Sequence, residues 1–152
     1  LRLTYEAVDY WNACRKSGRE WEIRYDETIL RQASAFIRFL RTGEMNFTPM
    51  HAEDYCFARA FGLIRMEEGA KRWSQLAGHE TDRLSEMEIA LETAHARNVV
   101  ESKDHRVDQA IRMYYRSMGW PITVQNMDVA NKSWPEFGRF LADAPELARS
   151  SD

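Results

Sequence analysis

The sequence has few residues that interrupt helices and no long apolar segment. It contains seven glycines and four prolines among 152 residues. Its longest strongly apolar run, at 55–64, is too short to cross a bilayer and contains Arg59. No signal peptide is recognisable at the start. We therefore expect a protein without a membrane partner.

Cysteine is also scarce, since only Cys14 and Cys56 occur. Two cysteines make no disulfide framework, which favours a reducing compartment and a cytoplasmic location. Their apolar neighbours predict buried thiols. The sequence also lacks a glycine-rich phosphate loop, a cysteine cluster with metal spacing and a nucleophile in a recognisable elbow or triad. No catalytic site follows from the residues alone.

The sequence also lacks a large excess of charge of either sign. The 21 basic and 24 acidic residues give a net charge of −3. Phosphate binding needs a concentrated basic surface, so nucleic acid is not expected as the principal partner. The hydrophobic content of 44% and the length together indicate one packed domain.

What the chain does have is apolar residues at helical spacing along most of its length. The clearest stripe runs from Ile29 to Leu40. We predict an all-α fold, an irregular bundle of about five to six helices, with one helical domain over 1–144 and a frayed C-terminal tail over 145–152. The expected helices are 4–16, 26–41, one that opens at Pro49 after Thr48, 82–100, 104–118 and a short one after Ser133.

Several boundaries depend on single residues. The third helix is expected to break near Gly69. Ser133 and Glu136 resemble a capping box that opens the last helix. Residues 121–132 are predicted to be irregular, with 122–124 as a possible extended piece. Trp120 follows Gly119 at a helix end, from where it is expected to plug the core, whereas Trp11, Phe36, Tyr114 and Phe137 fall on helical apolar stripes and are predicted core residues.

One metal-site hypothesis comes from Glu92 and His95, a Glu-x-x-His step on a predicted helix. Ferritin-like di-iron bundles present ligands at this spacing, with a second such motif and two further glutamates. This chain has no second Glu-x-x-His. His51, His79 and His105 lie near predicted helix ends, where histidine commonly caps or is solvated. A helix break is expected between Glu101 and His105.

Three segments resemble the helical C-terminal region of the aldehyde ferredoxin oxidoreductase family, which are tungsten- or molybdenum-pterin enzymes. The first, at 21–31, resembles a turn that leads into a glutamate-rich helix start. The second, at 113–120, is similar to the tyrosine pair and Gly-Trp that close a late helix of the family. Between them, 59–65 is similar to a family run of Arg-Ala-Phe-Asn type, with Gly62 in place of the asparagine.

The resemblance implies a helical fragment or subunit of an enzyme that oxidises aldehydes or related small molecules. The tungsten- or molybdenum-pterin and an iron–sulfur cluster would belong to upstream parts of such an enzyme. The chain alone would bind no cofactor and would not be catalytic. In this family one cluster cysteine follows an aspartate by five residues, as Cys14 follows Asp9. Cys14 is therefore either a metal ligand or a buried structural thiol.

The chain begins with Leu1 rather than Met, so under this hypothesis we expect a piece of a larger protein whose partner is another protein domain or subunit. Two further hypotheses stand beside it. The alternative is a stand-alone all-α protein-interaction or regulatory module without catalysis. A ferritin-like enzyme that uses Glu92 and His95 is the third.

Overall fold

The structure, a computed structural model, describes residues 3–21, 26–77, 82–145 and 147. In this part of the chain it contains seven α-helices, three short 3-10 helices and two strands of two residues each. The all-α prediction is confirmed. Most of the predicted tail, and His79, lie outside the described residues.

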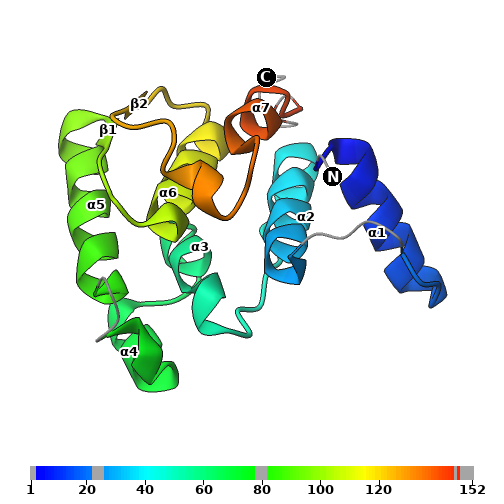
Figure 1. Cartoon of the computed structure of the whole chain (residues 1–152), viewed down its shortest axis with the longest axis horizontal. Coiled ribbons are helices and arrows are strands. Elements are labelled where there is room, and N and C mark those ends of the chain that lie inside the picture. Colours follow the sequence, from blue (N-terminus) through cyan, green and yellow to red (C-terminus); the bar gives the residue numbers. More distant parts are fainter. Residues whose placement is uncertain (1–2, 22–25, 78–81, 146, 148–152) are drawn as a thin grey trace.

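In Figure 1, α5 lies at one end of the long axis and α1 at the other, with α6, α7 and α2 between them. The α-helices are α1 (Tyr5–Ser17), α2 (Glu27–Thr42), α3 (Tyr55–Ala60), α4 (Met66–Arg72), α5 (Arg83–Arg97), α6 (His105–Met118) and α7 (Phe137–Ala142). The 3-10 helices are η1 (Ala52–Asp54), η2 (Ser74–Leu76) and η3 (Ala130–Lys132). The strands β1 (Val99–Val100) and β2 (Thr123–Val124) pair in parallel, which confirms the extended piece expected at 122–124.

Helix ends follow the capping chemistry in the sequence. Thr4, Asp26, Asp82 and Asp104 each accept a backbone N–H in the first turn of α1, α2, α5 and α6. Gly18, Gly43 and Gly119 end three of these helices in the left-handed conformation.

Three predicted boundaries are wrong. No helix opens at Pro49, because the carbonyls of Thr48 and Pro49 accept hydrogen bonds from Arg31 and Arg72 instead. The helix break predicted near Gly69 lies instead at Gly62 (φ 73°), and Gly69 lies inside α4.

Ser133 does not open the last helix. Its hydroxyl contacts His105 and Gln109, and α7 begins after Glu136.

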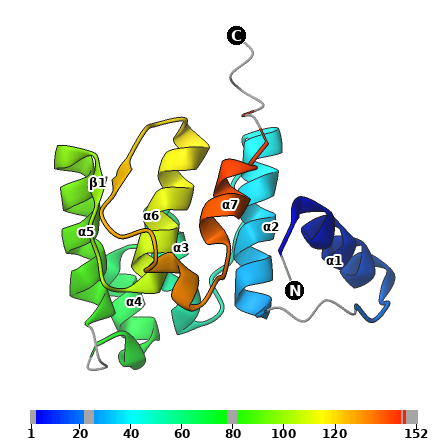
Figure 2. The same cartoon turned by 45° about the horizontal axis from the view of Figure 1, so that its top comes forward.

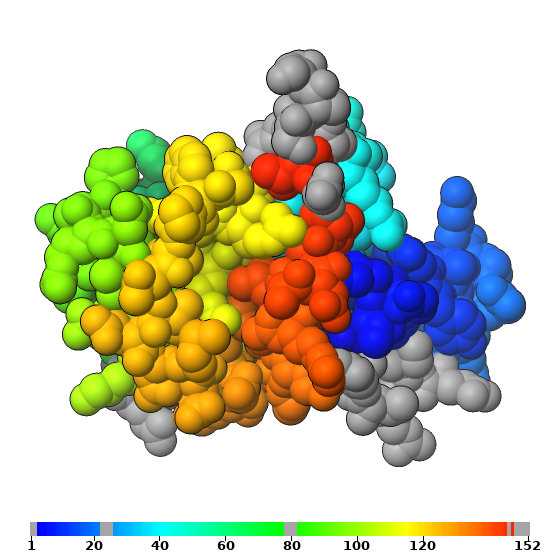
Figure 3. Space-filling model, turned by 90° about the horizontal axis from the view of Figure 1, so that it is seen from above, coloured from blue at the N-terminus to red at the C-terminus, as the bar shows by residue number. Residues whose placement is uncertain are grey.

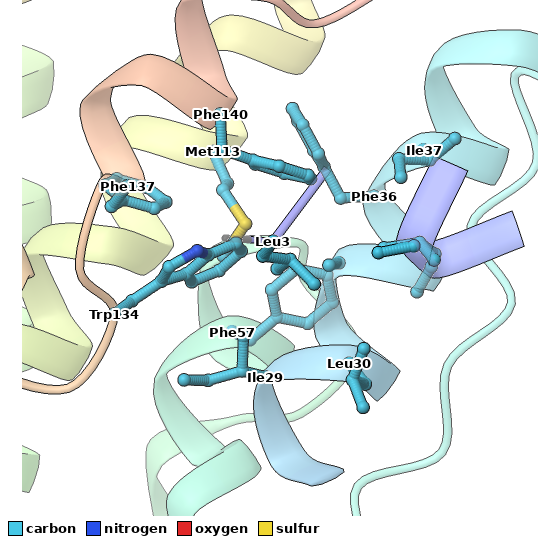
Figure 4. Close-up of a cluster of buried hydrophobic side chains, with 14 of the residues drawn as sticks. Leu3, Ile29, Leu30, Phe36, Ile37, Phe57, Met113, Trp134, Phe137 and Phe140 are labelled. Carbon is cyan, nitrogen blue, oxygen red and sulfur yellow. The ribbon is translucent and has the colours of Figure 1, made fainter. Parts of the chain in front are cut away.

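The buried apolar side chains form two clusters. The first joins α1, α2 and α7, and Figure 4 shows Trp134, Phe137 and Phe140 gathered around Met113 and Phe36. The second joins α3, η2, α5 and β1, with partly buried Val124 of β2 packed against it. Helix α6 supplies residues to both clusters and lies between them in Figures 1 and 2.

No helix in the described part of the chain is long and apolar enough to cross a membrane.

Candidate functional site

The exposed feature that stands out is Trp120, directly after the end of α6. Gly119 (φ 72°) reverses the chain there, and the backbone N–H of Trp120 donates to the carbonyl of Tyr115 over 3.0 Å. The Trp120 side chain is 49% exposed, so the prediction that it plugs the core is wrong. It instead packs on the outer edge of α6.

An aromatic path leads from the core to Trp120. Buried Phe57 contacts Phe61 at 4.7 Å between ring centroids, and Phe61 meets Tyr114 edge-on at 5.4 Å. Tyr114 and Tyr115 then contact the Trp120 ring edge-on at 6.0 and 5.8 Å. Edge-to-face contacts of this kind hold ring orientations, so the position of Trp120 is set by rings anchored in the core.

A groove of about 410 Å³ opens beside this path, and we call it the aromatic groove. Its polar members are few: Arg59, His95 and the tyrosine hydroxyls. Its lining comes from α3, the turn after it, α5 and α6: Arg59, Ala60, Phe61, Gly62, Leu91, His95, Tyr114, Tyr115 and Trp120. A concave, mainly apolar surface with a few polar groups is the usual form of a binding site.

A second hollow lies on the other side of Trp120, and we call it the α7 pocket. Its volume is about 270 Å³, and α6, α7 and the β2 segment form its walls: Arg112, Arg116, Trp120, Ile122, Val124, Gly138, Leu141 and Ala142. Figure 3 shows the chain from α6 to α7 covering the middle of this face of the molecule. Trp120 is thus a wall shared by two hollows.

The ionisable side chains in the described lining of the two hollows are basic, apart from the tyrosines. Their described lining residues include Arg59, His95, Arg112 and Arg116, and no aspartate or glutamate. Arg59 is held by Glu88, whose two oxygens accept from Nε at 2.7 Å and Nη2 at 3.2 Å. In a chain with net charge −3, this is a local basic, aromatic surface.

Arg112 and Asp108 form an ion pair inside the protein. Their side chains are 4% and 2% exposed, and Nη1 of Arg112 lies 3.2 Å from Oδ1 of Asp108. Burial raises the pKa of Asp108, although Arg112 opposes the shift. The Arg112 guanidinium also lies over the Phe137 ring at 4.9 Å.

A larger ion-pair network ties the start of α6 to its neighbours. Arg83 Nε lies 2.8 Å from Asp104 and its Nη1 3.3 Å from Glu53, whose other oxygen accepts from Arg106 at 2.7 Å. Burial alone would raise the pKa of Asp104, but Arg83 and backbone N–H groups outweigh it and hold that pKa below its usual value. Neighbouring Cys56 is fully buried, and this burial raises the pKa of its thiol.

The residues proposed as metal ligands come from two elements, Glu92 and His95 from α5 and Cys14 from α1. Glu92 and His95 are exposed on α5, and His95 lines the aromatic groove. Among the residues that the structure describes, no three His, Cys, Asp or Glu side chains gather as a metal site would require. The pairing of Glu92 with His95 in a di-iron site stays a prediction.

Cys14 is buried in α1, as predicted for a thiol. Asp9 lies on the surface, where its carboxylate pairs with Arg41 at 3.1 Å. The role of Cys14 as a cluster ligand stays a prediction.

Two further histidines lie in the described part of the chain. His51 precedes η1, and its backbone N–H donates to Oδ2 of Asp54 over 3.3 Å. His105 begins α6, and its Nδ1 lies 2.5 Å from Ser133 Oγ. The break expected between Glu101 and His105 is confirmed, because the chain runs from β1 through a bend into α6.

Sequence reasoning missed Arg112 and Asp108 as functional candidates. They are four residues apart on one helix, an ordinary pairing on exposed surfaces. What distinguishes the pair is that Arg112 lies beside Phe137 and Gly138 of α7, and the helical pattern of α6 does not contain this tertiary contact.

No family model, curated protein or solved structure matches this chain. The site itself must therefore support any functional conclusion. The resemblance to aldehyde ferredoxin oxidoreductases stays a prediction.

Proposed function

We propose that this chain is a helical protein-interaction module that binds an acidic partner segment with a large apolar side chain in the aromatic groove. The observation that carries the proposal is Trp120, half exposed yet held in place by Tyr114 and Tyr115. A large side chain whose orientation is fixed before binding loses little entropy on binding.

The composition of the groove supports a protein partner. Tryptophan, tyrosine and arginine dominate the binding energy of protein interfaces, and all three line this groove. Its volume of about 410 Å³ accommodates large side chains rather than a flat contact.

The charges support an acidic partner. His95 and Arg59 lie at the groove, and the described lining residues carry no carboxylate. The Glu88 pair reduces the field of Arg59, so the unoccupied edge of this arginine provides a moderate attraction, and the His95 ring adds a hydrogen-bonding group. Acidic residues that flank an aromatic or leucine anchor match this pattern. Two free, buried cysteines are consistent with a cytoplasmic location, which we also propose.

A selection from a random peptide-display library tests the proposal. We expect enriched sequences to combine Phe, Trp or Leu with Asp or Glu. Synthetic versions should bind Trp120→Ala at least about tenfold more weakly than the wild type. His95→Glu, at an exposed position, should weaken binding by adding a negative charge to the groove, whereas Met127→Ala, exposed but outside the groove, should not.

Two results would contradict the proposal. One is an enriched set rich in lysine and arginine. The other is equal affinity of the enriched peptides for wild type, Trp120→Ala and His95→Glu in titration calorimetry.

A second candidate is the helical part of an aldehyde ferredoxin oxidoreductase-like enzyme. It is favoured by one observation: the segments 59–62 and 114–120, which carry much of the resemblance, line the same groove. In that proposal the groove faces a pterin-binding partner domain, which would supply tungsten or molybdenum and the iron–sulfur cluster. An upstream reading frame that encodes a cysteine-rich, sheet-forming region, with tungsten or molybdenum in the purified full-length protein, is the expected result. A start codon immediately before Leu1 would contradict it.

A further inference from the structure

Arg112 is a buried arginine at the wall of a cavity. Its side chain is 4% exposed, yet it lines the α7 pocket. Among the described residues it donates one hydrogen bond, from Nη1 to Asp108 over 3.2 Å. A guanidinium has five N–H donors, and a buried one is costly unless more of them are satisfied. The Arg112 guanidinium therefore has further N–H donors that it can offer to a ligand inside a low-dielectric site.

Gly138 leaves one edge of this guanidinium uncovered. A Cβ at position 138 would lie 3.6 Å from Nη2 of Arg112, and the residue has no side chain to fill that space. Phe137 covers one face of the guanidinium. The open direction is thus the edge, from which guanidinium groups donate to planar acceptors.

The rest of the pocket is apolar. Trp120, Ile122, Val124 and Leu141 form the walls, and the volume of about 270 Å³ suits a small ligand or a single side chain. A phosphate or sulfate prefers a more polar, hydrated surrounding than these walls provide. A carboxylate on an aliphatic chain matches both the arginine edge and the walls.

The charge balance favours an anion as well. Asp108 offsets one positive charge. Arg116, also in the wall, donates to the backbone carbonyls of Ala144 and Pro145 at 3.0 and 3.4 Å, which are neutral acceptors. Two guanidinium groups and one carboxylate leave an excess of one positive charge.

We propose that the α7 pocket is a binding site for an aliphatic carboxylate, with Arg112 as the anchor of the carboxylate and Trp120, Ile122, Val124 and Leu141 around the chain. The carboxylate can belong to a small organic acid or to the C-terminal residue of a protein. This proposal does not depend on the function assigned to the aromatic groove.

The test uses octanoate, 1-octanol and two short peptides that end in leucine, one as the free acid and one as the amide. Binding is measured by titration calorimetry and by the shift of the Trp120 indole N–H signal, assigned with Trp120→Phe. We expect octanoate or the free-acid peptide to bind at least about tenfold more tightly than its uncharged counterpart. The tighter of the two acids identifies the source of the carboxylate.

Gly138→Val is the decisive variant, because it covers Nη2 while leaving Arg112 and Asp108 in place. It should weaken acid binding at least about tenfold and leave binding of groove-selected, amidated peptides unchanged. Arg139→Gln, exposed on α7 and outside the pocket, is the matched control. Circular dichroism verifies that both variants are folded.

The proposal is overturned if the acids bind no better than 1-octanol and the peptide amide, or if Gly138→Val binds them as tightly as the wild type. Loss of groove peptide binding in Trp120→Ala and His95→Glu, with acid binding retained in His95→Glu, would separate the two sites.

Discussion

Gly69 and Gly138 both lie inside helices, and they differ in what a methyl group would meet there. At Gly69 a Cβ would lie 2.6 Å from Cδ2 of Tyr55, a ring that is fully buried. At Gly138 the nearest atom is 3.6 Å away, an ordinary van der Waals contact. The first glycine is required by packing, and the second leaves space.

We therefore expect Gly69→Ala to lower the free energy of unfolding by about 1–3 kcal/mol, despite the better helix propensity of alanine. Gly138→Ala, the matched control, should be neutral or up to about 1 kcal/mol more stable. Urea denaturation of both variants measures the difference. Equal stability of Gly69→Ala and the wild type would mean that Tyr55 moves aside at little cost.

For single residues, the sequence predicts well which side chains are buried but poorly the direction in which a side chain points. Trp11, Phe36 and Phe137 are fully buried, as their helical spacing predicts. Trp120 lies outside any stripe, so its direction depends on Tyr114 and Tyr115 and on the turn at Gly119. A sequence pattern contains the turn but not the face toward which the ring then packs.

Helices α5 and α6 are both capped by an aspartate, but the two aspartates lie in different surroundings. Asp82 is exposed and caps α5 through the N–H of Ser85. Asp104 is 3% exposed, caps α6 through Arg106 and Val107, and also pairs with Arg83. The second aspartate thus links two helices as well as capping one.

Asp104→Ala should lower the free energy of unfolding by about 3 kcal/mol or more, because it removes the cap and leaves Arg83 without its buried partner. Asp82→Ala should cost about 1 kcal/mol, the usual value for an exposed cap. Thermal and urea unfolding compare the two. A similar loss in both variants would show that the Arg83 contact adds nothing to stability.

Helix positions follow from the sequence more reliably than helix ends do. The stripes in α2 and α6 are local, so they are visible in the sequence. At Gly69 the glycine makes room for the Tyr55 ring and does not mark a helix end. The failures at Pro49 and Ser133 arise where distant residues bind the capping groups: Arg31 and Arg72 bind the carbonyls of Thr48 and Pro49, and His105 contacts the Ser133 hydroxyl. The same reason hides the α7 pocket, whose walls come from separate elements.

For the molecule as a whole, His105 makes stability depend on pH. Burial, and next the charge of Arg106, lower the pKa of His105 below the usual value for histidine, about 6.5. The neutral form is therefore favoured in the folded state. The stability that this gives is present above the unfolded-state pKa and is lost as pH falls from about 6.5 through the folded-state pKa.

We expect the free energy of unfolding to fall between pH 7.5 and about 5, and His105→Gln to reduce this fall. Denaturant unfolding at several pH values in that window measures both slopes. His51→Gln, at an exposed histidine, is the matched control. Identical slopes in the wild type and His105→Gln would contradict the prediction.

Helix α6 has a consequence for how the molecule opens. It contributes Met113 to the first apolar cluster and Val107, Ala110, Ile111 and Tyr115 to the second, whereas α1 contributes only to the first. Opening either cluster alone leaves part of α6 covered by the other. Its backbone amide protons should then exchange with deuterium last, and only through global unfolding, while those of α1 exchange earlier through partial opening. Helix α6 would then be the last helix to lose its structure as the protein unfolds.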